Sequence, residues 1–174
     1  MTAPVIIPGI ARDGSLFPIE KLRAHTDAVF HLAVSVFVFN EDGELLIQRR
    51  ADGKYHCGGK WANTCCTHPH WQECSAASAG RRLHEELCFT VPLQERSVVE
   101  YAADVGSGLH EHEKVTVFTG VAPRSVADIA PNPDEVSETR WVALDDLKAE
   151  IAERPDDFTP WFRIYLERFP DLTF

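Results

Sequence analysis

The stretch THPHWQECSAASAGRRLHEELCF, residues 67–89, joins a histidine-containing loop to a segment of helix-forming composition. The composition favours a helix over residues 73–87, although Gly80 weakens it. Arg81 and Arg82 each stand four residues before a glutamate. Ion pairs on an exposed helix surface are therefore sufficient to explain the charges of this segment.

The same stretch also resembles the Nudix box, G-x5-E-x7-R-E-U-x-E-E-x-G-U, in which U is an aliphatic residue. The positions that match this motif are Glu73, Arg81, Leu83, Glu85 and Glu86. Thr67 and Cys88 replace the two glycines, and Arg82 replaces the first glutamate of the helix core. In the family, the helix carboxylates hold metal ions against a diphosphate and activate water. The resemblance implies that Arg82 removes one metal ligand and supplies a phosphate-binding cation instead.

Around this segment the sequence alternates apolar, β-branched runs with turns. Strands are predicted at residues 30–39, 44–50, 97–104, 113–122 and 136–144, and further helices at residues 145–154 and 158–169. The turn NEDG makes a hairpin of the first two strands, and residues 51–70 are predicted to form a loop. Asp145 or Asp146 is predicted to cap one helix, and Thr159 precedes Pro160 in the first turn of the other. The order predicts an α+β single domain over residues 1–174, with a mixed sheet flanked by helices and a motif-bearing core at 21–161.

Composition limits the classes of partner. The chain has 174 residues, 44% hydrophobic and 25% charged, and its formal net charge is −10. This charge and the lack of a lysine/arginine run argue against nucleic acid. No apolar run reaches the ~20 residues that cross a bilayer. The N-terminus has no export-signal pattern, so we expect a cytoplasmic protein. An anionic substrate would require a local concentration of basic side chains.

Several histidines and glutamates are candidate ligands for a divalent transition ion such as Zn²⁺ or Mn²⁺: His25, His31, His68, Glu111 and Glu113. In HEHE, residues 110–113, the two glutamates point to the same side of an extended strand. Two carboxylates on one side need a cation between them, or a proton on one of them. The alternative is that each histidine is an ordinary surface or core residue and that HEHE is a solvated strand face.

Five cysteines, at positions 57, 65, 66, 74 and 88, are an odd number in a chain without a secretion signal, so we expect free thiols, metal ligands or a catalytic thiol and no structural disulfides. Within NTCCTHP, residues 63–69, a structural zinc knot lacks the usual C-x2–4-C spacing, and a redox pair lacks C-x-x-C. A catalytic thiol beside a histidine remains as the third hypothesis.

Taken together, these features resemble type I isopentenyl-diphosphate isomerase, a Nudix-fold family of isoprenoid biosynthesis. The resemblance rests on segments in a fixed order: AHT and HLAVS, RRADGKYH, WANTCCTHP, RRLHEEL, EYAADVGSGLHEHE, and FTPW. It implies isomerisation of isopentenyl diphosphate to dimethylallyl diphosphate through a tertiary carbocation. Such a reaction needs an acid and a base that face each other, a surrounding that tolerates a cation, and little water.

The resemblance also implies roles for individual residues. Cys66 and Glu113 would exchange protons with the substrate, with help from Tyr101, and Trp161 would face the cationic carbon. Cys65 would be a packing residue. The transition ion, Mn²⁺ or Zn²⁺, would be held by His25, His31, His68, Glu111 and Glu113. The diphosphate would be held by Lys21, Arg50, Lys54 and Arg82, and by Mg²⁺ bound to Glu86.

Three other functions are compatible with the same residues. A Nudix diphosphohydrolase would act on a nucleotide or isoprenoid diphosphate, although Arg82 and the cysteine–histidine loop argue against it. A prenyl-diphosphate cyclase would use the same acid and the same aromatic side chain on a longer substrate. A zinc-stabilised binding module would need the cysteines for folding. The expected partner is a small prenyl diphosphate. The sequence does not indicate which oligomeric state the protein adopts.

Overall fold

Strand β3 (His31–Asn40) lies at the centre of the sheet in the computed structural model, which describes residues 4–123 and 129–174. It pairs in parallel with β8 (Leu109–Ala122) and antiparallel with β6 (Cys65–Thr67). Both faces of β3 are covered, since Val34 and Val36 belong to one core cluster and Phe37 to the other. Burial on both faces explains why this strand is apolar at nearly every position.

The remaining strands complete a mixed sheet. They are β1 (Ile6–Ile10), β2 (Leu16–Glu20), β4 (Leu45–Arg50), β5 (Trp61–Ala62), β7 (Leu93–Gly106) and β9 (Val136–Val142). The order β2-β1-β3-β4-β5 forms one path, while β7 pairs with β8 and β9 pairs with β4. Only the β3–β8 pair is parallel among these strands. The predicted mixed sheet is confirmed.

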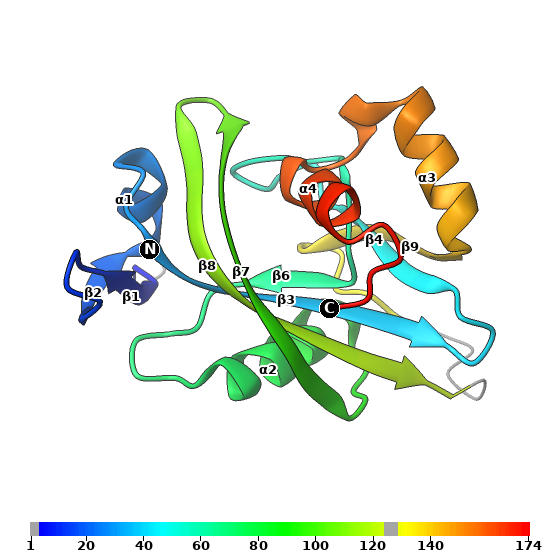
Figure 1. Cartoon of the computed structure of the whole chain (residues 1–174), viewed down its shortest axis with the longest axis horizontal. Coiled ribbons are helices and arrows are strands. Elements are labelled where there is room, and N and C mark those ends of the chain that lie inside the picture. The colour runs from blue at the N-terminus through cyan, green and yellow to red at the C-terminus, as the bar shows by residue number, and fades with distance from the viewer. Residues whose placement is uncertain (1–3, 124–128) are drawn as a thin grey trace.

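Helices cover both faces of this sheet (Figure 1). Helix α2 (Ser75–Leu87) packs on one face, where its apolar side meets Val34, Val36 and Leu46. Helices α3 (Leu144–Glu153) and α4 (Pro160–Arg168) lie on the opposite face. The result is a three-layer arrangement with one apolar cluster on each side of the sheet. None of the helices in the described part of the chain is long and apolar enough to span a membrane.

Strands β7 and β8 form a long hairpin, which extends above the rest of the sheet in Figure 1. The turn places Gly106, Ser107 and Gly108 at φ of 86°, 56° and 72°. This left-handed backbone is the reason that two glycines flank the serine. Both strands run further into the turn than the predicted ranges 97–104 and 113–122.

Several predicted helix boundaries were wrong. Helix α2 begins two residues after the predicted Glu73. Helix α3 has Ala143 at its N-cap, so neither Asp145 nor Asp146 caps it; both lie in its first turn, where they face the positive end of the helix dipole. Thr159 does occupy the N-cap of α4 before Pro160, but its side chain makes no capping bond.

The N-terminal elements and the strands inside the predicted loop 51–70 were missed. In β1, IIPGI, proline and glycine interrupt the strand pattern, and its pairing with β2 comes from tertiary contacts. Helix α1 (Lys21–Thr26) has only six residues, and the Glu20 carboxylate caps it by accepting from the N–H groups of Leu22 and Arg23. This short helix carries Lys21 and His25 to the end of the sheet.

Candidate active site

The register of three neighbouring strands brings predicted site residues side by side. His31 on β3 lies opposite Glu113 on β8, and Glu113 lies opposite Tyr101 on β7. Glu111, two residues earlier on β8, faces the same side of the sheet. The two glutamates are 5% and 4% exposed, while His112 between them is exposed. The HEHE segment is therefore a strand whose two glutamates lie on a buried face. The alternative that these glutamates lie on a solvated strand face is wrong.

Glu113 is held by three side chains. Its Oε1 lies 2.9 Å from Nε2 of His68 and 3.3 Å from Nε2 of His31. Its Oε2 accepts a hydrogen bond of 2.8 Å from the Tyr101 hydroxyl, which also lies 2.9 Å from Oε2 of Glu111. Burial alone would raise the pKa of Glu113, but the contacts with His31 and His68 hold it well below its usual value.

Glu111 is perturbed in the opposite direction. Burial, and then the negative charge of Glu113, raise the pKa of Glu111 well above its usual value. Two buried carboxyl groups bridged by one phenol cannot both keep a charge cheaply, so they titrate as a pair. Glu111 therefore retains its proton where Glu113 has lost its own.

The histidines are oriented by the backbone. Nδ1 of His25 lies 2.8 Å from the Lys21 carbonyl oxygen, and Nδ1 of His31 lies 2.6 Å from that of Val29. A carbonyl oxygen only accepts, so each Nδ1 carries a hydrogen, and each Nε2 has a lone pair that can take up a proton or a metal ion. Both rings are fully buried, and burial lowers the pKa of His25. Burial also lowers the pKa of His68, to about 3.

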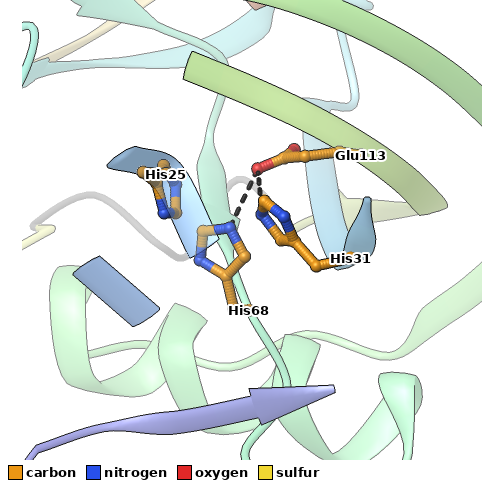
Figure 2. A group of neighbouring side chains, drawn as sticks. All are labelled: His25, His31, His68 and Glu113. Atoms are coloured by element: carbon orange, nitrogen blue, oxygen red, sulfur yellow. Dashed lines mark hydrogen bonds and ion pairs between the residues drawn. The ribbon is translucent and has the colours of Figure 1, made fainter. Parts of the chain in front are cut away.

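These lone pairs converge. The ligand atoms of His25, His31, His68 and Glu113 all lie within 4.8 Å of one another, and Figure 2 shows the three rings grouped at the carboxylate. Among the described residues, Nε2 of His25 has no hydrogen-bond partner. Neutral nitrogen lone pairs that face a buried carboxylate need a cation, and this donor set suits a divalent transition ion. The cluster is a candidate site for a divalent metal ion.

Glu111 lies outside that group of four. Its carboxylate groups instead with His25 and His56, again within 4.8 Å. His56, which the sequence did not single out, comes from the loop after β4, and burial lowers its pKa to about 2. The loop reverses tightly, since a side chain at Gly58 would meet the Asp52 carbonyl oxygen at 2.5 Å. A single histidine in a glycine-containing loop offers no periodic signal that could have indicated its position.

Cys66 lies on β6, directly opposite Ser35 on β3. Its Sγ lies 3.1 Å from the Ser35 hydroxyl oxygen and donates to Oδ1 of Asn63 at 3.0 Å. Burial raises the pKa of the Cys66 thiol to about 12. The neighbouring Cys65 faces the opposite side of the sheet and is fully buried in the α2 cluster, so its predicted packing role is confirmed.

The zinc-knot hypothesis finds no support in this geometry. All five cysteines are free, so the expectation of no structural disulfide is confirmed, and Cys74 and Cys88 are exposed. Within residues 4–123 and 129–174, the groups of side chains able to hold a metal contain histidine and glutamate but no cysteine. The thiol of Cys57 points at the Val105 carbonyl oxygen, 3.8 Å away.

One pocket of about 480 Å³, including its open mouth, joins most of the predicted residues. The predicted residues that line it are Lys21, Arg50, Lys54, Cys66, His68, Arg82, Glu86, Tyr101, Glu111, Glu113 and Trp161. His25 and His31 are fully buried and are not among the residues that line the pocket. The further lining residues, which the sequence did not indicate, are Val34, Tyr55, His56 and Thr67.

The mouth of this pocket is basic. Burial, and then the charges of Lys54, Arg82 and Arg50, lower the pKa of Lys21 to about 8. Arg82 contacts Glu85 at 2.9 Å and Glu86 at 2.6 Å. These i,i+3 and i,i+4 pairs include the predicted Arg82–Glu86 pair.

Glu135, which the sequence did not indicate as a site residue, pairs with two of these cations. Its carboxylate contacts Arg82 at 2.9 Å and also pairs with Lys54. The Arg82 guanidinium therefore stands among three carboxylates where the Nudix box has a further glutamate. A cation built into the protein thus stands beside carboxylates that, in the motif, are metal ligands.

Glu86 keeps its place through a buried network. Oε2 of Glu86 accepts a hydrogen bond of 2.8 Å from Nε2 of Gln48, which also donates to the Thr64 carbonyl oxygen at 2.7 Å. Glu86 is buried but lines the pocket, so its remaining lone pairs can hold a second divalent ion beside the basic mouth.

Trp161 forms part of the pocket wall. The bridge between Trp61 and Phe158, and the bond from Thr159 N–H to the Trp61 carbonyl oxygen, fix the segment that begins α4. The Arg50 guanidinium carbon lies 5.4 Å from the centre of the Trp161 ring, within the range of a cation–π contact.

Comparison with known proteins agrees with this geometry. Residues 29–162 match the family model of the NUDIX domain. The chain is 54% identical to an isopentenyl-diphosphate Delta-isomerase of Cereibacter sphaeroides over 94% of this chain and 91% of that protein. It is 49% identical to an isopentenyl-diphosphate Delta-isomerase of Ruegeria pomeroyi over 98% of this chain and 93% of that protein.

Among solved structures, a MutT protein from Methanosarcina mazei shares the fold, with a TM-score of 0.65 and 23% identity over 81% of this chain and 93% of that one. That likeness supports the predicted Nudix fold alone, whereas the sequence relatives narrow the family. The chain therefore belongs to the isopentenyl-diphosphate Delta-isomerases within the NUDIX family.

Proposed function

We propose that this protein isomerises isopentenyl diphosphate to dimethylallyl diphosphate by moving a double bond within the five-carbon chain. The observation that carries the proposal is the composition of one pocket. A partly buried thiol, two carboxyl groups bridged by a tyrosine hydroxyl, and an indole ring line it together with four cations. The sequence relatives, which are isopentenyl-diphosphate Delta-isomerases, support the same reaction.

The chemistry requires one proton to enter and another to leave. Protonation of the terminal CH₂ carbon of the alkene forms a C–H bond and leaves a tertiary carbocation. Loss of a proton from the CH₂ group on the other side of the cationic carbon forms the new double bond. We assign the two exchanges to Glu113 and Cys66 and leave their order open, because the reaction is reversible. The hydrogen bond from Tyr101 to Glu113 would stabilise the carboxylate after it gives up a proton.

The inner pocket is suited to a cation. Trp161 offers an electron-rich ring face, which stabilises positive charge by a cation–π interaction. Its Nε1 is buried and has no hydrogen-bond partner among the described residues. The low exposure of Trp161 and Tyr101 helps to exclude water, which would trap the carbocation as an alcohol.

The cations would anchor the diphosphate. Lys21, Arg50, Lys54 and Arg82 would supply the local positive charge that a chain of net charge −10 needs for an anionic substrate. Glu86 would hold Mg²⁺, which adds positive charge against the diphosphate.

The histidine cluster would hold a transition ion. We assign Mn²⁺ or Zn²⁺ to His25, His31, His68 and Glu113, with Glu111 as a further ligand as the family resemblance implies. When bound, the ion would fix the Glu113 carboxyl group and tune its acidity.

The test is incubation of the protein with isopentenyl diphosphate and divalent metal in D₂O. We expect dimethylallyl diphosphate with deuterium in the methyl group formed by protonation, detected by NMR, without release of phosphate. Glu113→Gln and Cys66→Ala should abolish deuterium incorporation while the variants remain folded, as judged by circular dichroism. Phosphate release without isomerisation would instead establish a diphosphohydrolase, and cyclic products from a longer prenyl diphosphate would establish a cyclase.

A further inference from the structure

A chain of hydrogen bonds connects Cys66 with helix α4. The Tyr165 hydroxyl donates to Oγ of Ser35 at 2.9 Å, and Oγ of Ser35 lies 3.1 Å from Sγ of Cys66. The Cys66 thiol donates to Oδ1 of Asn63 at 3.0 Å. Tyr165, Ser35 and Asn63 are almost fully buried, so water cannot readily replace a partner that is removed.

The donors in this chain all point the same way. Nδ2 of Asn63 donates to the carbonyl oxygens of Val36 and Cys65, at 3.0 and 3.2 Å. That orientation turns Oδ1 of Asn63 toward the sulfur, where it can only accept. The Tyr165 hydroxyl donates its hydrogen bond to Ser35, so the Ser35 hydroxyl can donate its own hydrogen bond to the Cys66 sulfur. The direction is therefore Tyr165 to Ser35 to Cys66 to Asn63.

The Tyr165 end of this hydrogen-bond chain lies in an aromatic cluster. Tyr165 packs edge-on against Phe37 at 5.2 Å between ring centres, and also against Tyr101 and Phe174. A proton passed along these hydrogen bonds would have to come from a phenol in this aromatic cluster, and the resulting phenolate would be buried in an apolar core. The chain therefore holds the sulfur in place and does not connect it to solvent.

We propose that Ser35 and Tyr165 are positioning residues for the Cys66 thiol in the proton exchange. This inference rests on the proposed function. Asn63 can bond the sulfur only while the sulfur carries its hydrogen, whereas the Ser35 hydroxyl can donate to the sulfur with or without that hydrogen. Ser35 thus keeps the sulfur aligned through both halves of the exchange, and Tyr165 keeps the Ser35 hydrogen directed at the sulfur.

The kinetic test uses Ser35→Ala, Tyr165→Phe and the double variant. Ser35→Ala should lower kcat about tenfold, equivalent to ~1.4 kcal/mol, and Tyr165→Phe should lower it several-fold. KM for isopentenyl diphosphate should change by less than about twofold, since a group that acts on the chemical step leaves ground-state binding unchanged. The double variant should match Ser35→Ala, because Tyr165 acts through Ser35 and the two losses are not additive.

Ser78→Ala is the matched control. Ser78 is also a fully buried serine, but it lies in α2, and its Oγ has no hydrogen-bond partner among the described residues. Its removal should leave kcat unchanged. A general effect of losing a buried hydroxyl would lower kcat in Ser78→Ala as well, and that result would overturn the inference.

A second readout needs no turnover. The S–H stretching band of Cys66, isolated by subtracting the infrared spectrum of Cys66→Ala, reports the hydrogen bonds of the thiol. The band should shift in Ser35→Ala and Tyr165→Phe but not in Ser78→Ala. An unchanged band, an unchanged kcat in Ser35→Ala, or multiplicative losses in the double variant would each overturn the inference. If the wild-type protein does not isomerise the substrate, the proposed function fails, whereas the band shift still decides the role of Ser35 and Tyr165.

Discussion

Replacing Glu73 by glutamine separates the structural part of the Nudix box from its chemistry. The Glu73 carboxylate accepts two hydrogen bonds from Arg81, at 2.7 and 2.8 Å, and one from the backbone N–H of His70, at 2.8 Å. It therefore ties the loop that carries His68 to helix α2. Among the described residues, Glu73 is not part of the pocket wall. We expect Glu73→Gln to cost stability while leaving kcat close to the wild-type value.

The magnitude follows from the carboxyl pKa. The hydrogen bonds from Arg81 lower the pKa of Glu73 from 4.5 to about 2. At ~1.36 kcal/mol for each tenfold change in acidity, this corresponds to roughly 3 kcal/mol of stabilisation. The side chain is 17% exposed, and solvent screening reduces the expected loss to about 2 kcal/mol.

The sign of the pH dependence is fixed by the direction of this change. A carboxyl group whose pKa is lower in the folded state stabilises the fold above its unfolded pKa, near 4.5, and loses that effect as the pH falls toward 2. The free energy of unfolding should therefore differ by about 2 kcal/mol between wild type and Glu73→Gln at pH 7, and the difference should shrink below pH ~4.5.

Urea unfolding at pH 7, 5, 4 and 3.5 measures this difference. Glu85→Gln is the matched control, because Glu85 contacts the same Arg81 at 3.1 Å, and Arg82 at 2.9 Å, but is 42% exposed. Its loss should cost less than about 1 kcal/mol. A difference for Glu73→Gln that stays constant down to pH 3.5, or one no larger than for Glu85→Gln, would refute the reasoning.

Three further substitutions test other parts of the site. Glu113→Gln should abolish turnover and lower the content of tightly bound divalent metal, measured by elemental analysis, and full activity would contradict its proposed role. Gly58→Ala should raise KM and cost ~1–3 kcal/mol, because a Cβ would meet the Asp52 carbonyl oxygen at 2.5 Å; the control Gly53→Ala, with open space around it, should have little effect. Arg82→Glu should destabilise the fold by ~2–4 kcal/mol, since it leaves neighbouring carboxylates without their cation, and Mg²⁺ should restore more stability to this variant than to wild type. Equal melting temperatures for Arg82→Glu and wild type would show that the three carboxylates do not need a cation.

Local patterns in the sequence predicted what local physics determines. The period of two in HEHE placed Glu111 and Glu113 on one side of a strand, and the apolar run of β3 predicted a strand. The helix of the box was predicted to within two residues at its start, because ends depend on caps, and the actual N-cap is Cys74. The motif resemblance supplied the residue roles, which local pattern alone left open.

Contacts between residues far apart in the chain could not be predicted from local sequence patterns. The parallel register of β3 with β8 sets His31 beside Glu113, and nothing in either strand specifies that alignment by itself. Gln48 and Glu135 were missed for the same reason, because their importance comes from contacts with Glu86 and Arg82, which lie 38 and 53 residues away from them in the chain. Polar residues of this kind look like ordinary surface residues until the fold is known.

The arginine at position 82, where the Nudix box has a glutamate, explains how this fold can favour proton exchange with the substrate over hydrolysis. A glutamate at position 82 would stand beside Glu86 and Glu135 and would require metal ions to balance the charge. Arg82 balances these carboxylates itself, and in the proposed function it would also bind the diphosphate. The proposed acid–base carboxyl instead comes from β8, beside the histidines and Tyr101. In the proposed function, substrate anchoring and carbon chemistry would thus lie on different elements. Diphosphate hydrolysis, which requires water activated beside the helix, would lose part of its metal site.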